Sequence, residues 1–162
     1  VLWQGLRDGY VDTIATDHSP HTLDEKGSDL YGKLTKPAIW DCISGFCGVE
    51  TGVPLILTEV NKGRLTLNQY VKVACENPAR VWQVFPKKGA IRLGTDGDIT
   101  VVDMDKEGTI DVSKLHSKNK PSPWHGWKVK GMPVLTVVRG HVQMRDGEPC
   151  GKAIGRMLKP LI

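Results

Sequence analysis

The stretch Val11-Asp12-Thr13-Ile14-Ala15-Thr16-Asp17-His18-Ser19-Pro20-His21 decides how this chain is to be interpreted. Its apolar beginning, residues 11–15, predicts a short buried strand. The run leads to an acid, Asp17, and His21 follows four residues later with a proline between them. Enzymes built on a parallel (β/α)8 barrel keep their catalytic groups at the C-terminal ends of the strands. Asp17 is therefore a candidate catalytic residue.

The same residues also permit a simpler interpretation as the start of a helix. An acid, a serine and a following proline are common there, with Ser19 as the N-cap and Pro20 as the first helical residue. On Asp17 and His21 alone both interpretations stay open, and the rest of the chain has to decide between them.

Composition and charge place the chain among ordinary globular proteins. Its 162 residues, 40% hydrophobic and 25% charged, suffice for one domain, and a net charge of +4 is too small to indicate a nucleic-acid or membrane partner. No stretch approaches the roughly 20 apolar residues that cross a bilayer. With no signal peptide, and with cysteines too widely spaced for a C-x-x-C motif, we expect reduced thiols and a cytoplasmic location. The cysteines are Cys42, Cys47, Cys75 and Cys150.

Helical patterns dominate the first half. Residues 2–8 predict the tail of a helix that Gly9 stops, as if the chain began in the middle of a larger fold. Residues 23–35 predict a polar surface loop, either a binding loop or a mobile connector. Residues 45–60 predict a helix packed on a barrel, with Pro54 in its first turns or at a kink. A further helix begins at the capping box of Thr66 and Gln69, and Asn77-Pro78 is expected to break it.

Short strands dominate the second half. Residues 89–93 and 99–103 predict a hairpin around a glycine-rich turn, and residues 133–138 and 141–144 predict a second strand pair. The glycine-rich turn has no following helix and no phosphate-loop pattern, so a hairpin is favoured. Residues 113–130 mix lysines with Trp124 and Trp127, but prolines interrupt the basic pattern. We expect two buried tryptophans to pin this segment, without nucleic-acid binding. The histidines at 116, 125 and 141 lack metal-ligand spacing, and the basic tail at 151–162 could dock on a partner subunit.

The order of these features resembles the cyclic amidohydrolases, and dihydroorotases in particular. Residues 3–9 followed by Asp17 and His21 resemble the approach to the eighth barrel strand of that family. Three further stretches follow the family pattern. Residues 48–55 are similar to its last barrel helix, and residues 76–80 are similar to a recurrent helix end. Residues 89–101 are similar to the return into a second, β-rich domain. The resemblance covers essentially the whole chain.

An α/β fold class follows from this resemblance. It implies the C-terminal part of a metal-dependent (β/α)8 barrel together with part of a flanking β-sandwich built from both chain ends. Residues 1–85 would hold the last strand and C-terminal helices of the barrel. Residues 86–162 would hold the C-terminal part of the β-sandwich domain and the tail.

The resemblance also implies zinc-dependent hydrolysis of a cyclic amide, first of all the reversible reaction of dihydroorotate and carbamoyl-aspartate in pyrimidine biosynthesis. Asp17 would ligate zinc, of which the complete enzyme would hold two ions, and would carry a proton from the attacking water to the leaving ring nitrogen. His21 would contact the acidic group of the substrate. Backbone groups near Ser44 and Gly45 would hold the ring amide. The complete protein is expected to be a homo-oligomer.

Part of the family pattern is absent from this sequence. The first-strand H-x-H pair, the bridging lysine and the middle-strand histidines are missing, and Asp17 alone cannot hold zinc, which needs three or four ligands. We therefore expect this chain to be the C-terminal part of an enzyme or its remnant, completed by an N-terminal part of the barrel. By itself it should be inactive and should bind zinc weakly.

Other members of the same group are the main alternatives. Residues 85–89 and 139–152 look as much like hydantoinases and dihydropyrimidinases, but those relatives carry a cysteine and an aromatic residue where this chain has Ser19 and His21. Allantoinases have the serine and a cysteine in place of His21. A non-catalytic scaffold derived from the same fold is an alternative of another class, against which the retained Asp17 and His21 argue.

Overall fold

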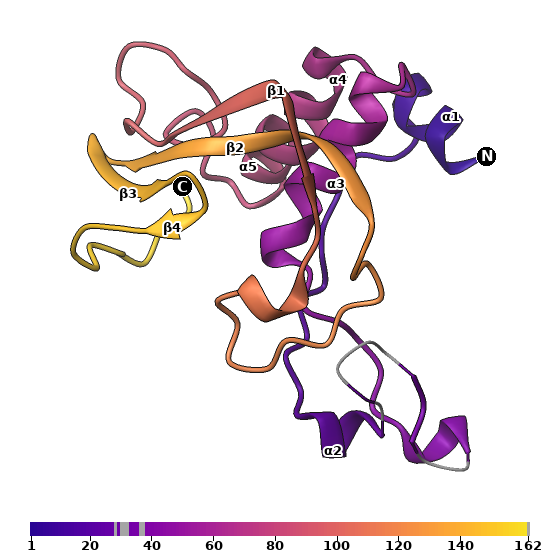
Figure 1. The fold of residues 1–162 in the computed structure, drawn as a ribbon. Coiled ribbons are helices and arrows are strands. Elements are labelled where there is room, and N and C mark those ends of the chain that lie inside the picture. Colours follow the sequence, from indigo (N-terminus) through magenta and orange to yellow (C-terminus); the bar gives the residue numbers. More distant parts are fainter. Residues whose placement is uncertain (28, 30–32, 36–37, 162) are drawn as a thin grey trace.

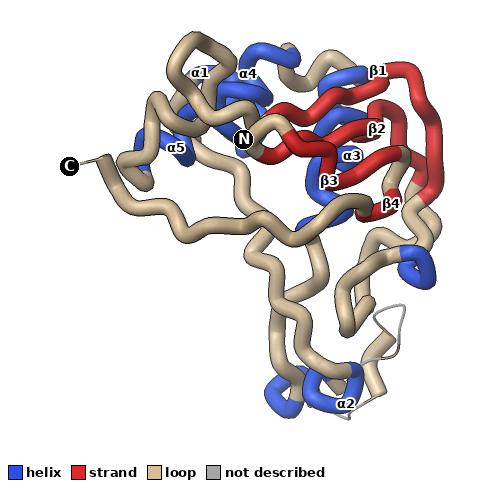
Figure 2. The backbone as a smooth tube through the Cα atoms, turned by 90° about the vertical axis from the view of Figure 1, so that its left-hand side faces the viewer, coloured by secondary structure: helices blue, strands red, loops and turns tan. Residues whose placement is uncertain are grey.

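The structure, a computed structural model, describes residues 1–27, 29, 33–35 and 38–161. Four strands form one antiparallel sheet in the order β1-β2-β3-β4, and most helices lie around one end and one face of it, whereas the short helix α2 lies far from the sheet (Figures 1 and 2). The helices are α1 (Leu2–Asp8), α2 (Leu23–Lys26), α3 (Val49–Asn61), α4 (Leu67–Val71) and α5 (Asn77–Val81). The strands are β1 (Ile99–Thr109), β2 (Lys128–Val138), β3 (His141–Arg145) and β4 (Glu148–Pro149), and short 3-10 turns lie at Ile39–Asp41 and Val112–Lys114.

Helix α3 packs along β2 (Figure 1). Leu57 of α3 is fully buried, and a Cβ placed on Gly131 of β2 would lie only 2.8 Å from its Cβ. The Lys130 amide donates to the Thr58 hydroxyl at 2.9 Å, and the Asn61 side chain donates to the Lys130 carbonyl at 3.0 Å. The close approach and the hydrogen bonds together fix α3 along the strand. They also fix the position of its N-terminal end.

The helix predicted at 45–60 is confirmed as α3, although it begins at Val49 and contacts the sheet within this chain. Pro54 lies in its second turn, as predicted. The predicted helix tail at the start of the chain is confirmed as α1, which ends at Gly9 in a left-handed conformation.

The expected helix break at Asn77-Pro78 is wrong. The capping box of Thr66 and Gln69 starts α4 as predicted, but a π-helical turn at Lys72–Glu76 then carries the chain directly into α5. In the wider turn the Asn77 amide donates to the Lys72 carbonyl. Pro78 follows without breaking the helix, because a proline near the start of a new helical segment needs no amide hydrogen.

The sheet also differs from the predicted pair of hairpins. The pair at 133–138 and 141–144 is confirmed as β2 and β3, and the strand at 99–103 is the first half of β1. The strand at 89–93 is wrong, and β1 pairs instead with β2, with Ile99 opposite Val137. Gly89 explains the difference, because a Cβ there would lie 2.6 Å from Ala79 and 2.8 Å from the Cys75 carbonyl. Its segment packs against the helices and is not available to the sheet.

The predicted strand at 11–15 forms no ladder with any described part of the chain. This segment is extended, and the first bridge beyond it joins His18 and Phe46 in parallel. Its backbone is bound to the helical region, where the Ile14 amide donates to the Val73 carbonyl at 3.1 Å and Asn77 donates to the Asp12 carbonyl at 2.8 Å. Strands of parallel sheets normally have strand neighbours that cover their backbone groups. Without such neighbours the segment stays partly exposed.

The two tryptophans do not pin residues 113–130 as predicted. Trp127 is 55% exposed and Trp124 is half-buried, whereas Pro121 and Ser122 are fully buried. The segment is anchored instead through its backbone, since the Cys47 amide donates to the Pro121 carbonyl at 3.4 Å.

None of the described helices has the length and apolar character needed to span a membrane.

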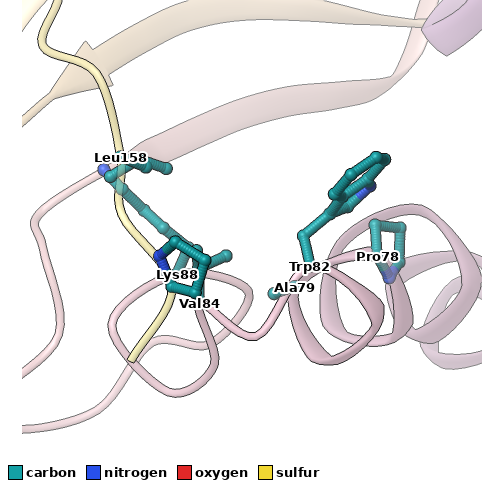
Figure 3. A pocket seen from close by; sticks show the side chains of 7 residues that line it. Pro78, Ala79, Trp82, Val84, Lys88 and Leu158 are labelled. Atoms are coloured by element: carbon teal, nitrogen blue, oxygen red, sulfur yellow. The ribbon is translucent and has the colours of Figure 1, made fainter. Parts of the chain in front are cut away.

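The C-terminal tail folds back over the helical end of the molecule (Figure 2). The Leu161 amide donates to the Gln83 carbonyl at 2.7 Å, and Arg139 donates to the Ile154 carbonyl. A hollow of about 440 Å³ separates the tail from α5, with Leu158 and Lys88 opposite Trp82 and Pro78 (Figure 3). Docking of this tail on a partner subunit, and a domain boundary at residue 85, stay predictions.

Candidate functional site

Asp17 lies directly before the His18–Phe46 bridge, in a segment without regular secondary structure, and its side chain is exposed. Its backbone φ is +44°, a value that few residues other than glycine adopt. The preceding residue, Thr16, is exposed but contacts the start of α3 on one side, because a Cβ on Gly52 would lie 2.9 Å from the Thr16 methyl group and one on Gly48 would lie 3.0 Å from the Thr16 Cβ. Backbone strain of this kind persists only where the surroundings hold it, and it is often found at functional sites.

His18 anchors the other side of Asp17. Its Nδ1 accepts hydrogen bonds from the Gly48 and Val49 amides, at 3.1 and 3.3 Å, in the first turn of α3. Because Nδ1 accepts, the ring proton of the neutral imidazole lies on Nε2. The residue before α3 is a glycine, which has no capping side chain of its own, so His18 supplies the cap. This role was not predicted from the sequence. The signal that could have shown it is the glycine before α3, which cannot cap the helix and so calls for a cap from another residue.

Residues 44–46 lie beside residues 17–19, where a parallel bridge joins His18 and Phe46. The Ser19 amide donates to the Phe46 carbonyl at 3.0 Å, and Gly45 adopts a φ of +98°. A Cβ on Gly45 would lie 2.4 Å from the Ser19 Cβ, so only glycine permits this approach. The structure thus brings Asp17, Ser44 and Gly45, which the sequence places far apart, into one region.

Replacing Gly45 by alanine is expected to lower the free energy of unfolding of the complete protein by about 2–4 kcal/mol, because backbone strain and overpacking add. Denaturant unfolding measures the loss. Gly147→Ala is the matched control, since Gly147 has a φ of +92° but no atom within 4 Å of the added Cβ. Equal losses for the two variants would contradict the close packing of Gly45 on Ser19.

His21 begins the turn that leads into α2. The alternative interpretation, in which Ser19 is the N-cap of the following helix, is wrong, because Thr22 caps α2 in a capping box with Glu25. The backbone and hydroxyl of Thr22 lower the pKa of Glu25, and its carboxylate lies 3.7 Å from the His21 Nδ1. Glu25 therefore forms an ion pair with His21 when the imidazole is protonated. Residues 23–26 are helical and not a loop, and the remainder of the predicted loop includes residues 28 and 30–32, which lie outside the described residues.

A third segment, residues 116–122, closes one side of this region. Asn119 donates from its side chain to the Pro20 carbonyl at 2.8 Å, and its own carbonyl accepts from the Cys47 thiol at 2.6 Å. Glu50 of α3 accepts from the His116 and Ser117 amides, and its carboxylate lies 2.8 Å from the His116 ring. Burial raises the pKa of Glu50, but the hydrogen bonds from His116 and Ser117 outweigh it and lower the pKa overall. The Glu50 hydrogen bond raises the pKa of His116.

The region does not by itself fit a zinc ion. No three histidine, cysteine, aspartate or glutamate side chains gather as a metal site among the residues that the structure describes. Asp17 offers one carboxylate where zinc needs three or four ligands, and the Nδ1 of His18 is bound to α3. A metal at Asp17 would need ligands from further residues.

Most of this chain is similar in sequence to known proteins. Residues 2–143 match the Amidohydrolase family. The chain belongs to this family. An L-hydantoinase of Paenarthrobacter aurescens is 39% identical over 148 residues, covering 91% of this chain and 31% of the relative. A dihydroorotase of Geobacter sp. (strain M21) is 43% identical over 143 residues, covering 88% and 31%. This amidohydrolase chain thus spans about a third of the length of these curated relatives.

Solved structures agree on the fold. An L-hydantoinase (dihydropyrimidinase) from Arthrobacter aurescens superposes with a TM-score of 0.85 at 39% identity, covering 93% of this chain and 32% of that one. A D-hydantoinase (dihydropyrimidinase) from Thermus sp. gives a TM-score of 0.84 at 35% identity, with the same coverage. The predicted fold class, part of an amidohydrolase (β/α)8 barrel with β-structure beside it, is confirmed.

Proposed function

We propose that the complete protein is a zinc-dependent hydrolase of cyclic amides to which this amidohydrolase chain contributes Asp17. The observation that carries the proposal is the placement of Asp17. Its carboxylate is exposed, while hydrogen bonds of His18 with the Gly48 amide and of Ser19 with the Phe46 carbonyl fix the residues that follow it. A rigid backbone beneath an accessible acid suits a group that has to meet a metal and a substrate in fixed geometry.

The chemistry assigned to Asp17 is proton transfer. A carboxylate near the reacting atoms can accept a proton from the attacking water and then deliver it to the leaving ring nitrogen. Zinc, when bound by Asp17 with ligands from outside this chain, would lower the pKa of that water and polarise the amide carbonyl. Ser44 and Gly45, which lie beside the Asp17 turn, would bind the ring amide through their backbone groups.

Dihydroorotate is the proposed substrate, in a cytoplasmic pyrimidine-biosynthesis enzyme that is a homo-oligomer. His21 supports this choice, because a protonated imidazole can donate a charge-assisted hydrogen bond to a carboxylate on the ring. Dihydroorotases also stand among the relatives. Hydantoin is the second candidate, because a relative and solved structures of comparable identity are named hydantoinases.

A side-by-side assay of the complete protein with dihydroorotate, hydantoin and allantoin tests the proposal. Dihydroorotate should have the highest kcat/KM. A preference for hydantoin would favour the second candidate, and a preference for allantoin would overturn both choices of ring while leaving cyclic-amide hydrolysis intact. If the zinc-loaded protein opens none of the three rings, the proposed function is contradicted and a non-catalytic scaffold is favoured.

A further inference from the structure

Lys26 is a buried lysine next to the Ser44–Gly45 segment of the site. It is the last residue of α2 and is only 3% exposed. Its ammonium donates a hydrogen bond to the Gly45 carbonyl and lies 5.3 Å from the centre of the Phe46 ring. Burying a charge is costly unless neighbouring groups compensate it, and a carbonyl and an aromatic face both do so. The contacts of Lys26 are therefore directed at the segment that contains Ser44 and Gly45.

That segment needs an anchor at this position. Glycine has access to backbone conformations of either sign of φ, so the peptides on both sides of Gly45 could rotate. The backbone is held at Ile43, whose amide donates to the Glu25 carbonyl at 3.3 Å, and at Phe46, whose carbonyl accepts from the Ser19 amide. Between these two points Lys26 holds the Gly45 carbonyl.

The position of Lys26 in α2 suits it to hold the Gly45 peptide. The capping box of Thr22 and Glu25 defines the short helix α2, and the Glu25 carbonyl binds Ile43 from the residue next to Lys26. One turn of helix thus carries both the contact to Ile43 and the contact to Gly45. A change at Lys26 would release the Gly45 peptide while the neighbouring contact at Ile43 remains.

We propose that Lys26 is a positioning residue: its ammonium fixes the Gly45 peptide and so sets the Ser44–Gly45 backbone that receives the ring amide of the substrate. The inference rests on the proposed function. Lys26 acts through Gly45 and does not touch the substrate, so its removal should weaken substrate binding more than it slows the chemical step.

The test uses the complete protein with Lys26→Met, which keeps an aliphatic stem of similar length but removes the ammonium. Lys26→Arg retains a charged donor, and Lys152→Met replaces an exposed lysine in the tail as the matched control. Two quantities are measured for each variant: amide hydrogen exchange of a peptide that covers residues 43–47, and the steady-state constants with the cyclic amide that the wild type prefers.

For Lys26→Met we expect exchange in 43–47 to rise about tenfold without a general rise elsewhere. KM should rise about tenfold, equivalent to about 1.4 kcal/mol, while kcat changes less than threefold. Lys26→Arg should recover part of both effects, and Lys152→Met should behave as the wild type. Unchanged exchange and KM would overturn the inference, as would a general rise in exchange over the whole molecule, because Lys26 would then be merely structural.

The exchange measurement also separates this inference from the proposed function. If the wild type opens no cyclic amide, the proposed function fails, and exchange alone decides on the anchor. A local rise in 43–47 would then still support Lys26 as the anchor of Gly45, whereas no change there would overturn it.

Discussion

Replacing Asp17 by asparagine in the complete protein is expected to lower kcat for the cyclic amide about 10²–10⁴-fold, the range that general acid–base groups contribute. The amide keeps the shape of the side chain but cannot accept a proton in the same way. Because Asp17 is exposed, the free energy of unfolding should hardly change. Steady-state kinetics, together with zinc content and a thermal unfolding curve, measures the three consequences.

Asp24→Asn provides the control for Asp17→Asn. Asp24 is also an exposed aspartate, it lies in the first turn of α2, and no catalytic role is assigned to it. It should retain the wild-type rate. An Asp17→Asn protein that turns over near the wild-type rate with full zinc occupancy would show that Asp17 has only a local structural role in its turn.

His21→Ala is expected to raise KM for dihydroorotate by about one to two orders of magnitude. A charge-assisted hydrogen bond to a substrate carboxylate contributes about 1.5–3 kcal/mol, and alanine removes it. Hydantoin has no such carboxylate, so its KM should change much less. Comparing both substrates on one preparation therefore isolates the role of His21 from any general disturbance of the α2 turn.

His141→Ala is the control for this measurement, since His141 is exposed at the start of β3, outside the site. It should leave both KM values unchanged. Equal losses with dihydroorotate and hydantoin in His21→Ala would contradict carboxylate binding by His21. The loss would then reflect the contact of His21 with Glu25 in the α2 turn.

Local signals predicted those elements whose stabilising contacts are near in sequence. Thr66 and Gln69 lie three residues apart and cap α4 on their own, and the β2–β3 pair turns at Arg139-Gly140 between two apolar runs. The break expected at Pro78 failed because a π-helical turn absorbs the proline, and no residue pattern at 72–76 announces such a turn. Residues 89–93 have the composition of a strand, but Gly89 packs closely on Ala79 and the Cys75 carbonyl, 10 and 14 residues earlier, and local composition does not announce that packing.

The candidate site shows the same limit. Asp17, His21, Ser44 and Gly45 were singled out from the motif and its resemblance, and the structure places them on adjacent segments. His18 and Lys26 were overlooked, since their partners are the Gly48 amide and the Gly45 carbonyl, 30 and 19 residues away. A histidine and a lysine in a polar stretch give no local sign that they bind a distant backbone.

Metal exchange on the complete protein tests whether Asp17 serves a zinc centre that opens a cyclic amide. Zinc content and cyclic-amide hydrolysis are measured on one preparation of the wild type and of Asp17→Asn, before chelation, after it and after zinc is returned. We expect stoichiometric zinc and hydrolysis in the wild type, loss of both on chelation, recovery of both with zinc, and little hydrolysis in Asp17→Asn throughout. Undiminished hydrolysis by the metal-free wild type, or an Asp17→Asn protein that equals the wild type at every stage, would contradict this role of Asp17.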